Sequence, residues 1–200
     1  MTDIPDLTLV EAAVNGDTTA FAELVARYQP GVWGMVHRTL GNSSDGEDAV
    51  QEILMRALIY MPKFDRRRPF GPWILRIASN YCIDQLRRRK TRKYKLLSDL
   101  SVAEEENLLR TMSTEWDIED LPHKDPDKYL EVAQFLVGGL KPKRRMAFIL
   151  REIEGHSYKT VAAILGIPEI TARVRVCRAR NDLERKFREY LATLEGGMKK

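Results

Sequence analysis

Residues 157–180 (SYKTVAAILGIPEITARVRVCRAR) contain two helical repeats of apolar residues, separated by a turn that holds a glycine and a proline. The first repeat places Val161, Ile164 and Leu165 on one helical face, and the turn then interrupts the helix. In the second repeat, apolar residues recur at spacings of four, three and four, at Ala172, Val176, Ala179 and Leu183. This pattern predicts two helices that meet at a tight turn and share a core, which is a helix-turn-helix motif.

The second of these helices carries polar and basic residues on the faces that the apolar repeat leaves free. In helix-turn-helix proteins this helix enters the major groove of duplex DNA, where arginines contact phosphates or guanine edges. The candidate DNA contacts are Thr171, Arg173, Val174, Arg175, Cys177 and Arg178. A solvated charged face is the alternative, but it does not explain the preceding helix and turn.

The rest of the chain also has helical periodicity, without a clear period-two alternation that would predict a strand. We expect helices near 7–15, 17–40 with an interruption at Pro30-Gly31, 44–60, 72–97, 129–140 and 142–154. Asp17 is an expected N-cap, and Ser44 begins a capping box with Glu47. The third of these helices has an apolar face of Val50, Ile53, Leu54, Ala57 and Leu58. The expected fold class is all-α.

The net charge of +4 conceals a strong alternation along the chain. Residues 87–97 carry seven basic residues and no acidic one, residues 98–127 have a net charge of −8, and residues 141–200 have a net charge of +8. Two basic zones separated by an acidic one indicate two contacts with polyanions and a connector between them. We expect residues 98–127 to be a flexible linker, with a short helix near Leu108.

Residues 45–54 (DGEDAVQEIL) place three carboxylates, Asp45, Asp48 and Glu52, on one face of a helix. Carboxylates in this arrangement can bind a metal ion, so a metal-dependent nuclease is one alternative function. No histidine lies nearby in the sequence and no glycine-rich phosphate loop is present, which favours a polar patch that docks a partner. A solvated acidic face also explains this motif when it is taken alone.

Aromatic residues flank basic ones between Phe64 and Lys95. A loop, FDRRRPFGP, leads into a helix with Trp73 and Tyr81, and then into the basic run RRRKTRKYK. Such a combination suits the unstacked bases and the phosphates of a single strand. Trp73 is in register with Ile77, which favours a place in the core for its ring.

The two cysteines, Cys82 and Cys177, are far apart and belong to no metal-binding motif, so we expect reduced thiols, no metal and no cofactor. No apolar run approaches the length of a membrane span. Residues 1–6 are acidic and lack the basic start and apolar core of a secretory signal. We therefore expect a cytoplasmic protein without membrane insertion.

Four segments together resemble the extracytoplasmic-function (ECF) sigma factors of the sigma-70 family, in the family's order and spacing. They are AFAELVARYQ (20–29), DGEDAVQEILMRA (45–57), KFDRRRPFGPWILRIASNYCIDQLRRRK (63–90) and EGHSYKTVAAILGIPEITARVRVCRARNDL (154–183). The resemblance implies a sigma-2 domain in residues 1–97, a flexible acidic linker in 98–127 and a helix-turn-helix sigma-4 domain in 128–200. It implies a protein that is not an enzyme and that promotes DNA melting at promoters of a stress-type or envelope-type regulon.

The resemblance also implies roles for individual residues. Asp48, Gln51, Glu52 and Met55 fall where the family grips the clamp helices of core RNA polymerase, whose beta and beta-prime subunits are expected partners. Lys63, Phe64, Asp65 and Arg66 fall in the loop that captures a flipped base of the minus-ten element, and Asn80, Asp84, Arg87 and Arg88 on the helix that faces it. The residues 171–178 singled out above fall on the helix that reads the minus-thirty-five element.

The expected DNA partner is thus a promoter, duplex at one element and single-stranded at the other. Members of the family are commonly held by an anti-sigma factor that masks both domains, and such a protein is a candidate partner. The alternative function is a stand-alone helix-turn-helix transcriptional regulator. That alternative explains residues 141–200, but neither the DGEDAVQEIL helix nor the aromatic and basic segment after it.

Overall fold

The computed structural model describes residues 4–41, 45–98 and 126–197, and every regular element within these ranges is helical. The first half contains α1 (Asp6–Val14), α2 (Thr18–Leu40), α3 (Asp45–Tyr60), a short 3₁₀ turn (Met61–Lys63) and α4 (Phe70–Ser98). The second half contains α6 (Pro126–Gly138), α7 (Pro142–Phe148), a π-helical turn (Ile149–Ile153), α8 (Tyr158–Leu165) and α9 (Glu169–Gly197). The expected all-α fold class is confirmed. The expected cap at Ser44 and the expected helix near Leu108 lie outside the described residues.

Helix α2 begins where the sequence predicts, because Asp17 caps it. The Asp17 carboxylate accepts hydrogen bonds from the backbone N–H groups of Thr19 and Ala20, at 2.8 and 3.1 Å. These two N–H groups have no acceptor within the helix, so the cap satisfies them and stabilises the first turn.

The predicted interruption at Pro30-Gly31 is wrong, because α2 continues through both residues to Leu40. Proline within a helix removes one backbone hydrogen bond and typically costs about 3 kcal/mol. The turns beyond Pro30 offset this cost by placing Val32, Met35 and Val36 in the core, each with 0% of its surface exposed. Burial of such side chains contributes roughly 1.5–3 kcal/mol each, which is enough to keep the helix continuous.

An aromatic cluster joins the start of α4 to the loop before it. The ring of Phe64 lies 5.6 Å from that of Phe70 and 5.0 Å from that of Trp73, between centroids. Phe70 also makes an edge-to-face contact with Tyr28 on α2 at 5.3 Å. The predicted packing of Trp73 against the core is therefore confirmed, and the cluster ties the loop at 61–69 to the helices beneath it.

The helix-turn-helix motif forms as predicted from α8, a tight turn and α9. Ser157 caps α8 by accepting a hydrogen bond from the Thr160 N–H at 3.1 Å. Gly166 ends that helix with φ +62°, a left-handed conformation that favours glycine. The side chains that the two helices bury against each other are Val161, Ile164, Ala172, Val176 and Ala179, all with 0% exposure.

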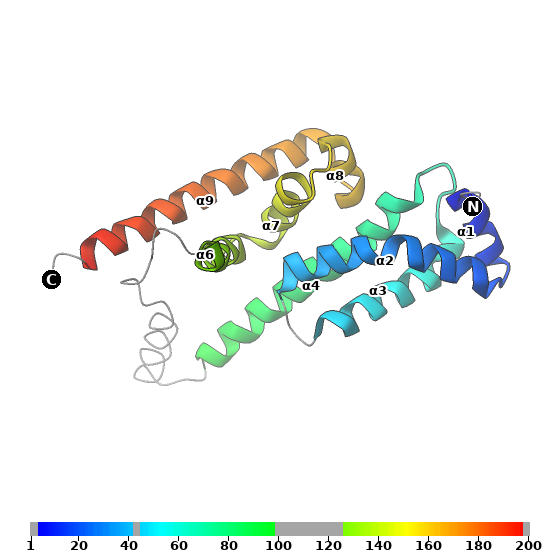
Figure 1. Cartoon of the computed structure of the whole chain (residues 1–200), viewed down its shortest axis with the longest axis horizontal. Helices are drawn as coiled ribbons and strands as arrows, with labels where there is room; N and C mark the ends of the chain where they lie inside the picture. Colours follow the sequence, from blue (N-terminus) through cyan, green and yellow to red (C-terminus); the bar gives the residue numbers. More distant parts are fainter. Residues whose placement is uncertain (1–3, 42–44, 99–125, 198–200) are drawn as a thin grey trace.

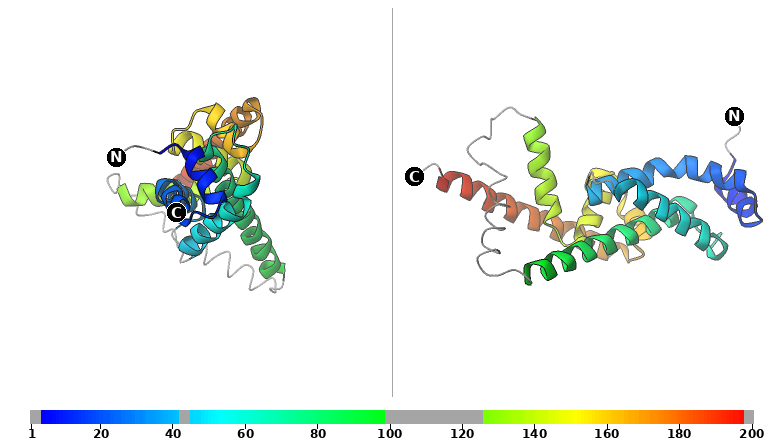
Figure 2. Two further views of the ribbon diagram at one scale, coloured as in Figure 1. Left: turned by 90° about the vertical axis from the view of Figure 1, so that its right-hand side faces the viewer. Right: turned by 90° about the horizontal axis from the view of Figure 1, so that it is seen from below.

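The two halves of the chain pack against each other through α4. Helices α2 and α3 contact α4 from the first half, and α7 and α8 contact it from the second, so the buried side chains of both halves form one continuous cluster. Figures 1 and 2 show the resulting elongated molecule, with α1 at one end and the last turns of α9 at the other. The second half is thus docked onto the longest helix of the first.

Two arginines of the first half lie against the second half. Arg38 near the end of α2 forms an ion pair with Glu154 at 2.7 Å, and His156 lies 3.3 Å from the same carboxylate. The guanidinium of Arg76 on α4 lies directly against Gly166, where an added Cβ would come within 2.1 Å of its Nη2 atom. The turn of the helix-turn-helix motif therefore faces α4, and glycine at 166 leaves room for this approach.

Replacing Ile164 by Ala tests the motif's core. We expect the free energy of unfolding to fall by about 2–5 kcal/mol, because Ile164 is fully buried and its removal leaves a cavity. The matched control is Ile170→Ala on α9, where 67% of the side chain is exposed and the change should stay within about 0.5 kcal/mol. Chemical denaturation of both variants measures the difference; equal losses would show that Ile164 is not a core residue.

Candidate nucleic-acid interface

The candidate contacts on α9 lie together along its first turns. Val174, Cys177 and Arg178 are exposed, and Thr171 and Arg175 are partly buried. Arg173 is held in place from two sides. Its guanidinium forms an ion pair with Glu169 at 2.7 Å and lies over the ring of Tyr158 at 4.5 Å from the ring centroid. This orders a long side chain before any ligand binds, which lowers the entropy that binding would cost.

The candidates on α4 form a second exposed group. Asn80, Asp84, Arg87 and Arg88 are all solvent-exposed. Asp84 and Arg87 form an ion pair at 3.1 Å along the helix. Exposed pairs of this kind contribute little to stability, so Arg87 can leave Asp84 for a phosphate at small cost.

The loop candidates divide into one buried and three accessible residues. Phe64 is only 6% exposed, because it belongs to the aromatic cluster, so its ring is not on the surface. Lys63, Asp65 and Arg66 are exposed or partly exposed around it. A hydrogen bond from the Arg67 side chain lowers the pKa of Asp65, and the backbone N–H of Arg67 lowers it further. The charges of the loop are therefore partly neutralised by one another.

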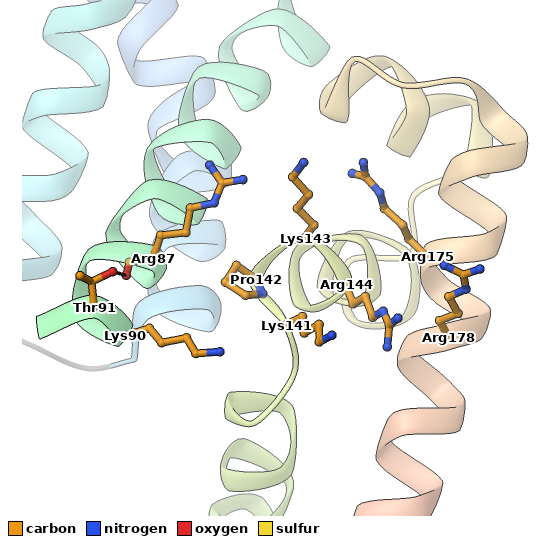
Figure 3. A pocket seen from close by; sticks show the side chains of 9 residues that line it. All are labelled: Arg87, Lys90, Thr91, Lys141, Pro142, Lys143, Arg144, Arg175 and Arg178. Carbon is orange, nitrogen blue, oxygen red and sulfur yellow. Dashed lines mark hydrogen bonds between the residues drawn. The ribbon is translucent and has the colours of Figure 1, made fainter. Parts of the chain in front are cut away.

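A groove of about 520 Å³ lies between α4, α7 and α9. Seven of its nine lining residues are Lys or Arg and none is acidic: Arg87 and Lys90 come from α4, Lys141, Lys143 and Arg144 from the start of α7, and Arg175 and Arg178 from α9. Figure 3 shows the α4 side chains on one side, those of α9 on the other and those of α7 between them. The structure thus brings together candidates from both halves that the sequence had placed in separate sites.

Four of these basic residues, Lys90, Lys141, Lys143 and Arg144, were not among the candidates from the sequence. The basic run 87–97 and the short run KPKRR (141–145) were the signals that could have indicated them. Within the groove, Arg144 is paired with Asp182 at 2.5 Å. Within the described part of the chain, the lysines at the start of α7 and the two arginines of α9 have no acidic partner.

A separate candidate surface lies on α3. Asp48, Gln51, Glu52 and Met55 are exposed or partly exposed on it, and Glu52 pairs with Arg56 at 2.7 Å. Met55 is 56% exposed and the neighbouring Ile59 is 63% exposed. Leu58, at the end of the apolar face expected for this helix, is 39% exposed and lies beside the same surface. The surface therefore combines acidic and apolar side chains, as interfaces with a hydrophobic centre and a polar rim do.

Among the described residues, no group of three or more His, Cys, Asp or Glu side chains is arranged to hold a metal ion. The side chain of Asp45, one of the three carboxylates considered for a nuclease, lies outside the described part. Across the ranges that the structure describes, none of the helices has both the length and the apolar character needed to cross a membrane.

The two thiols differ sharply in their surroundings. Cys82 is fully buried in α4, and burial raises the pKa of its thiol to about 12. Cys177 is exposed on α9 among the candidate DNA contacts. Both are free cysteines, as expected.

Each half of the chain matches a known protein family. The family described as Sigma-70 region 2 matches residues 24–92, and that described as Sigma-70, region 4 matches residues 130–183. The ECF RNA polymerase sigma factor SigW of Bacillus subtilis (strain 168) is 31% identical over 183 residues, covering 90% of this chain and 95% of SigW. The ECF RNA polymerase sigma-E factor of Escherichia coli (strain K12) is 32% identical over 197 residues, covering 94% and 97% of the two chains.

Solved structures agree with these sequence matches. The structure of CnrH in complex with the cytosolic domain of CnrY has a TM-score of 0.59 and 25% identity, and the match covers 92% of this chain and 97% of CnrH. The fold of the sigma factor RpoE from Bartonella quintana is also similar, with a TM-score of 0.57 over 84% of this chain and 96% of that one, at 24% identity.

The thiol environments predict a selective reaction with a disulfide reagent at pH 8. Only the thiolate reacts, and a pKa of about 12 leaves roughly one Cys82 thiol in ten thousand ionised at that pH. We therefore expect one rapid equivalent from Cys177 and a second only after unfolding in guanidinium. A Cys177→Ser variant should lose the rapid phase; two rapid equivalents in the folded protein would contradict the burial of Cys82.

Proposed function

Because the chain belongs to the extracytoplasmic-function sigma factors of the sigma-70 family, we propose that it binds core RNA polymerase and directs it to promoters with minus-thirty-five and minus-ten elements. The chain is a sigma factor and functions in transcription initiation. The observation that carries the finer proposal is the presence of basic side chains on α9 and on α4, and of a separate acidic and apolar surface on α3. We assign residues 1–97 to sigma-2, 98–127 to the linker and 128–200 to sigma-4.

The α9 surface is proposed to read the minus-thirty-five element as duplex DNA. Arg173, already held by Glu169 and Tyr158, would present its guanidinium to a guanine edge or a phosphate with little loss of entropy. Val174 is 40% exposed and offers an apolar contact that suits a thymine methyl group. Arg175 and Arg178 would contact phosphates and fix the register of the helix.

The α4 surface and the loop before it are proposed to hold the minus-ten element after melting. Flipping one base out of the stack costs a few kcal/mol, which contacts in the loop must offset. The burial of Phe64 leaves Lys63, Asp65 and Arg66 as the loop residues that can touch such a base. Phe64 then acts as a support that fixes the loop through Phe70 and Trp73.

The α3 surface is proposed to bind core RNA polymerase through its beta-prime subunit, with further contacts to the beta subunit elsewhere. Met55 and Ile59 would form the apolar centre of this interface, and Asp48, Gln51 and Glu52 its polar rim. We propose that the protein acts by recognition without catalysis, in the cytoplasm. An anti-sigma factor is a further proposed partner, since CnrH was solved with the cytosolic domain of a second protein.

Promoter binding requires the two halves to separate. The names of the two elements place them about 25 base pairs apart, or roughly 85 Å at about 3.4 Å per base pair. In the described arrangement, Arg87 of α4 and Arg175 and Arg178 of α9 line a single groove. The two surfaces therefore cannot occupy both elements of one duplex at once, and the packing of α7 and α8 on α4 must open first.

Run-off transcription with purified core polymerase on genomic fragments tests this proposal. We expect promoter-specific transcripts only when the protein is present, and their loss by at least about tenfold in an Arg173→Ala, Arg178→Ala double variant, because two charge-assisted contacts are removed. The same variant should still copurify with core polymerase, because both residues lie on α9 whereas the surface proposed for polymerase lies on α3.

A Met55→Asp variant provides the reciprocal control. It places a charge at the centre of the proposed polymerase interface, so copurification with core polymerase and transcription should both fail. Binding to duplex DNA should remain, because α9 is unchanged. Duplex DNA binding without any association of the wild-type protein with core polymerase would instead support a stand-alone regulator.

A further inference from the structure

The groove between α4, α7 and α9 concentrates positive charge from both halves of the chain in one place. Among the described residues, Lys141, Lys143, Arg175 and Arg178 form no ion pair or hydrogen bond through their side chains, and none of the lining residues is acidic. Like charges that face one another in a partly enclosed space repel, because the low-dielectric walls screen them less than water does. The closed packing of the two halves therefore creates an electrostatic cost at this groove.

A second, adjoining groove of about 330 Å³ shares Lys90, Lys141 and Pro142 with the first. Arg145 lines it, and the Nε atom of Arg145 is buried without a hydrogen-bond partner among the described residues. Burial lowers the pKa of Arg145, and the positive charge of Arg89 lowers it further. A partly buried guanidinium that has no acidic partner among the described residues is unfavourable, and an anion would satisfy it.

We propose that these joined grooves bind a linear polyphosphate, either inorganic or the phosphate chain of a nucleotide. The size of the first groove is in the range of small-ligand sites, roughly 300–1,000 Å³. Arginine and lysine are the side chains that proteins use to recognise phosphate groups. A single carboxylate would satisfy one of these cations, whereas a phosphate chain carries a charge on each successive group and reaches α4, α7 and α9 together.

Binding of a polyphosphate would affect both the packing of the two halves and the residues proposed to contact DNA. A bound polyphosphate would bridge Arg87 and Lys90 of the first half to Lys143 and Arg178 of the second, and so stabilise the closed packing. It would also occupy arginines that the proposed function assigns to promoter DNA. Binding itself depends on neither DNA nor polymerase, so the site can be tested even if the proposed promoter contacts are wrong.

Isothermal titration of the full chain with sodium tripolyphosphate, at a fixed ionic strength, tests the site. We expect saturable binding of one tripolyphosphate per chain. The Lys141→Ala, Lys143→Ala double variant should bind about tenfold or more weakly, because two charge-assisted contacts are lost. The matched control is Lys159→Ala, Arg188→Ala, which removes the same charge from exposed positions outside both grooves and should leave the affinity unchanged.

Four further titrants identify the ligand: ATP, sulfate, pentathymidylate and a penta-glutamate peptide. ATP that binds as tightly as tripolyphosphate shows recognition of the phosphate chain alone, and tighter binding of ATP shows that the nucleoside also contributes; both support the site. Sulfate at the same ionic strength should not compete. If sulfate competed as well as ATP, or if both double variants lost the same affinity for tripolyphosphate, the binding would be general attraction between charges. Either result would overturn the proposal.

Pentathymidylate and a penta-glutamate peptide carry a charge similar to that of tripolyphosphate. Tighter binding of either one through Lys141 and Lys143 would assign the groove to single-stranded DNA or to an acidic protein segment, and would overturn the proposal.

An Arg145→Met variant gives an independent readout through thermal unfolding. Methionine keeps an unbranched apolar chain like the aliphatic part of arginine and lacks the charge, so this chain should melt at the same temperature as the wild type or higher when no anion is present. Tripolyphosphate should raise the melting temperature of the wild type and raise that of Arg145→Met by less. An equal rise in both would show that Arg145 takes no part in the site.

Discussion

The fold depends on a single helix that serves two sets of neighbours. Helix α4 buries Phe70, Ile74, Ala78 and Cys82 and packs against α2 and α3, while α7 and α8 dock on it from the second half. One continuous core results, although the matches to sigma-70 regions 2 and 4 cover the two halves separately. Because the contacts between the halves come from short helices and include the ion pair of Arg38 with Glu154 at the surface end of α2, they can be exchanged for other partners more easily than the cores within each half.

This arrangement connects stability to function. The residues proposed to touch promoter DNA lie on α4 and α9, and the same packing that joins the halves turns Arg87, Arg175 and Arg178 toward one groove. A closed chain therefore presents one concentrated group of basic side chains, whereas an open chain would present the two surfaces proposed for DNA separately. The α3 surface that we propose for polymerase is not part of the groove, so its exposure does not depend on whether the groove is closed or open.

Much of the fold could be predicted from the sequence, because helix caps, turns and buried faces depend mainly on residue type and spacing. The cap at Asp17, the cap at Ser157, the left-handed turn at Gly166 and the buried face of α9 all follow from residue type and spacing. The predicted interruption at Pro30 was wrong, because tertiary burial outweighed a local preference. An apolar pattern also does not tell which of its residues are buried: Leu58 faces solvent on a surface proposed for a partner. Phe64 was correctly placed in its loop, but periodicity does not report that the loop folds back onto Trp73. The docking of the halves could not be predicted either, since it depends on which faces of α7 and α8 meet α4.

The two halves are proposed to pack together in the free protein and to separate on the promoter, and the distance between them tests this most directly. Spin labels at Thr91→Cys on α4 and Lys143→Cys on α7, in a Cys177→Ser chain, would report it by pulsed electron paramagnetic resonance, because both positions line the same groove and Cys82 is buried. We expect one short distance in the free protein, and an increase of roughly tens of ångströms when core polymerase and promoter DNA are bound. The same short distance in the free protein and in the promoter complex would contradict the proposal.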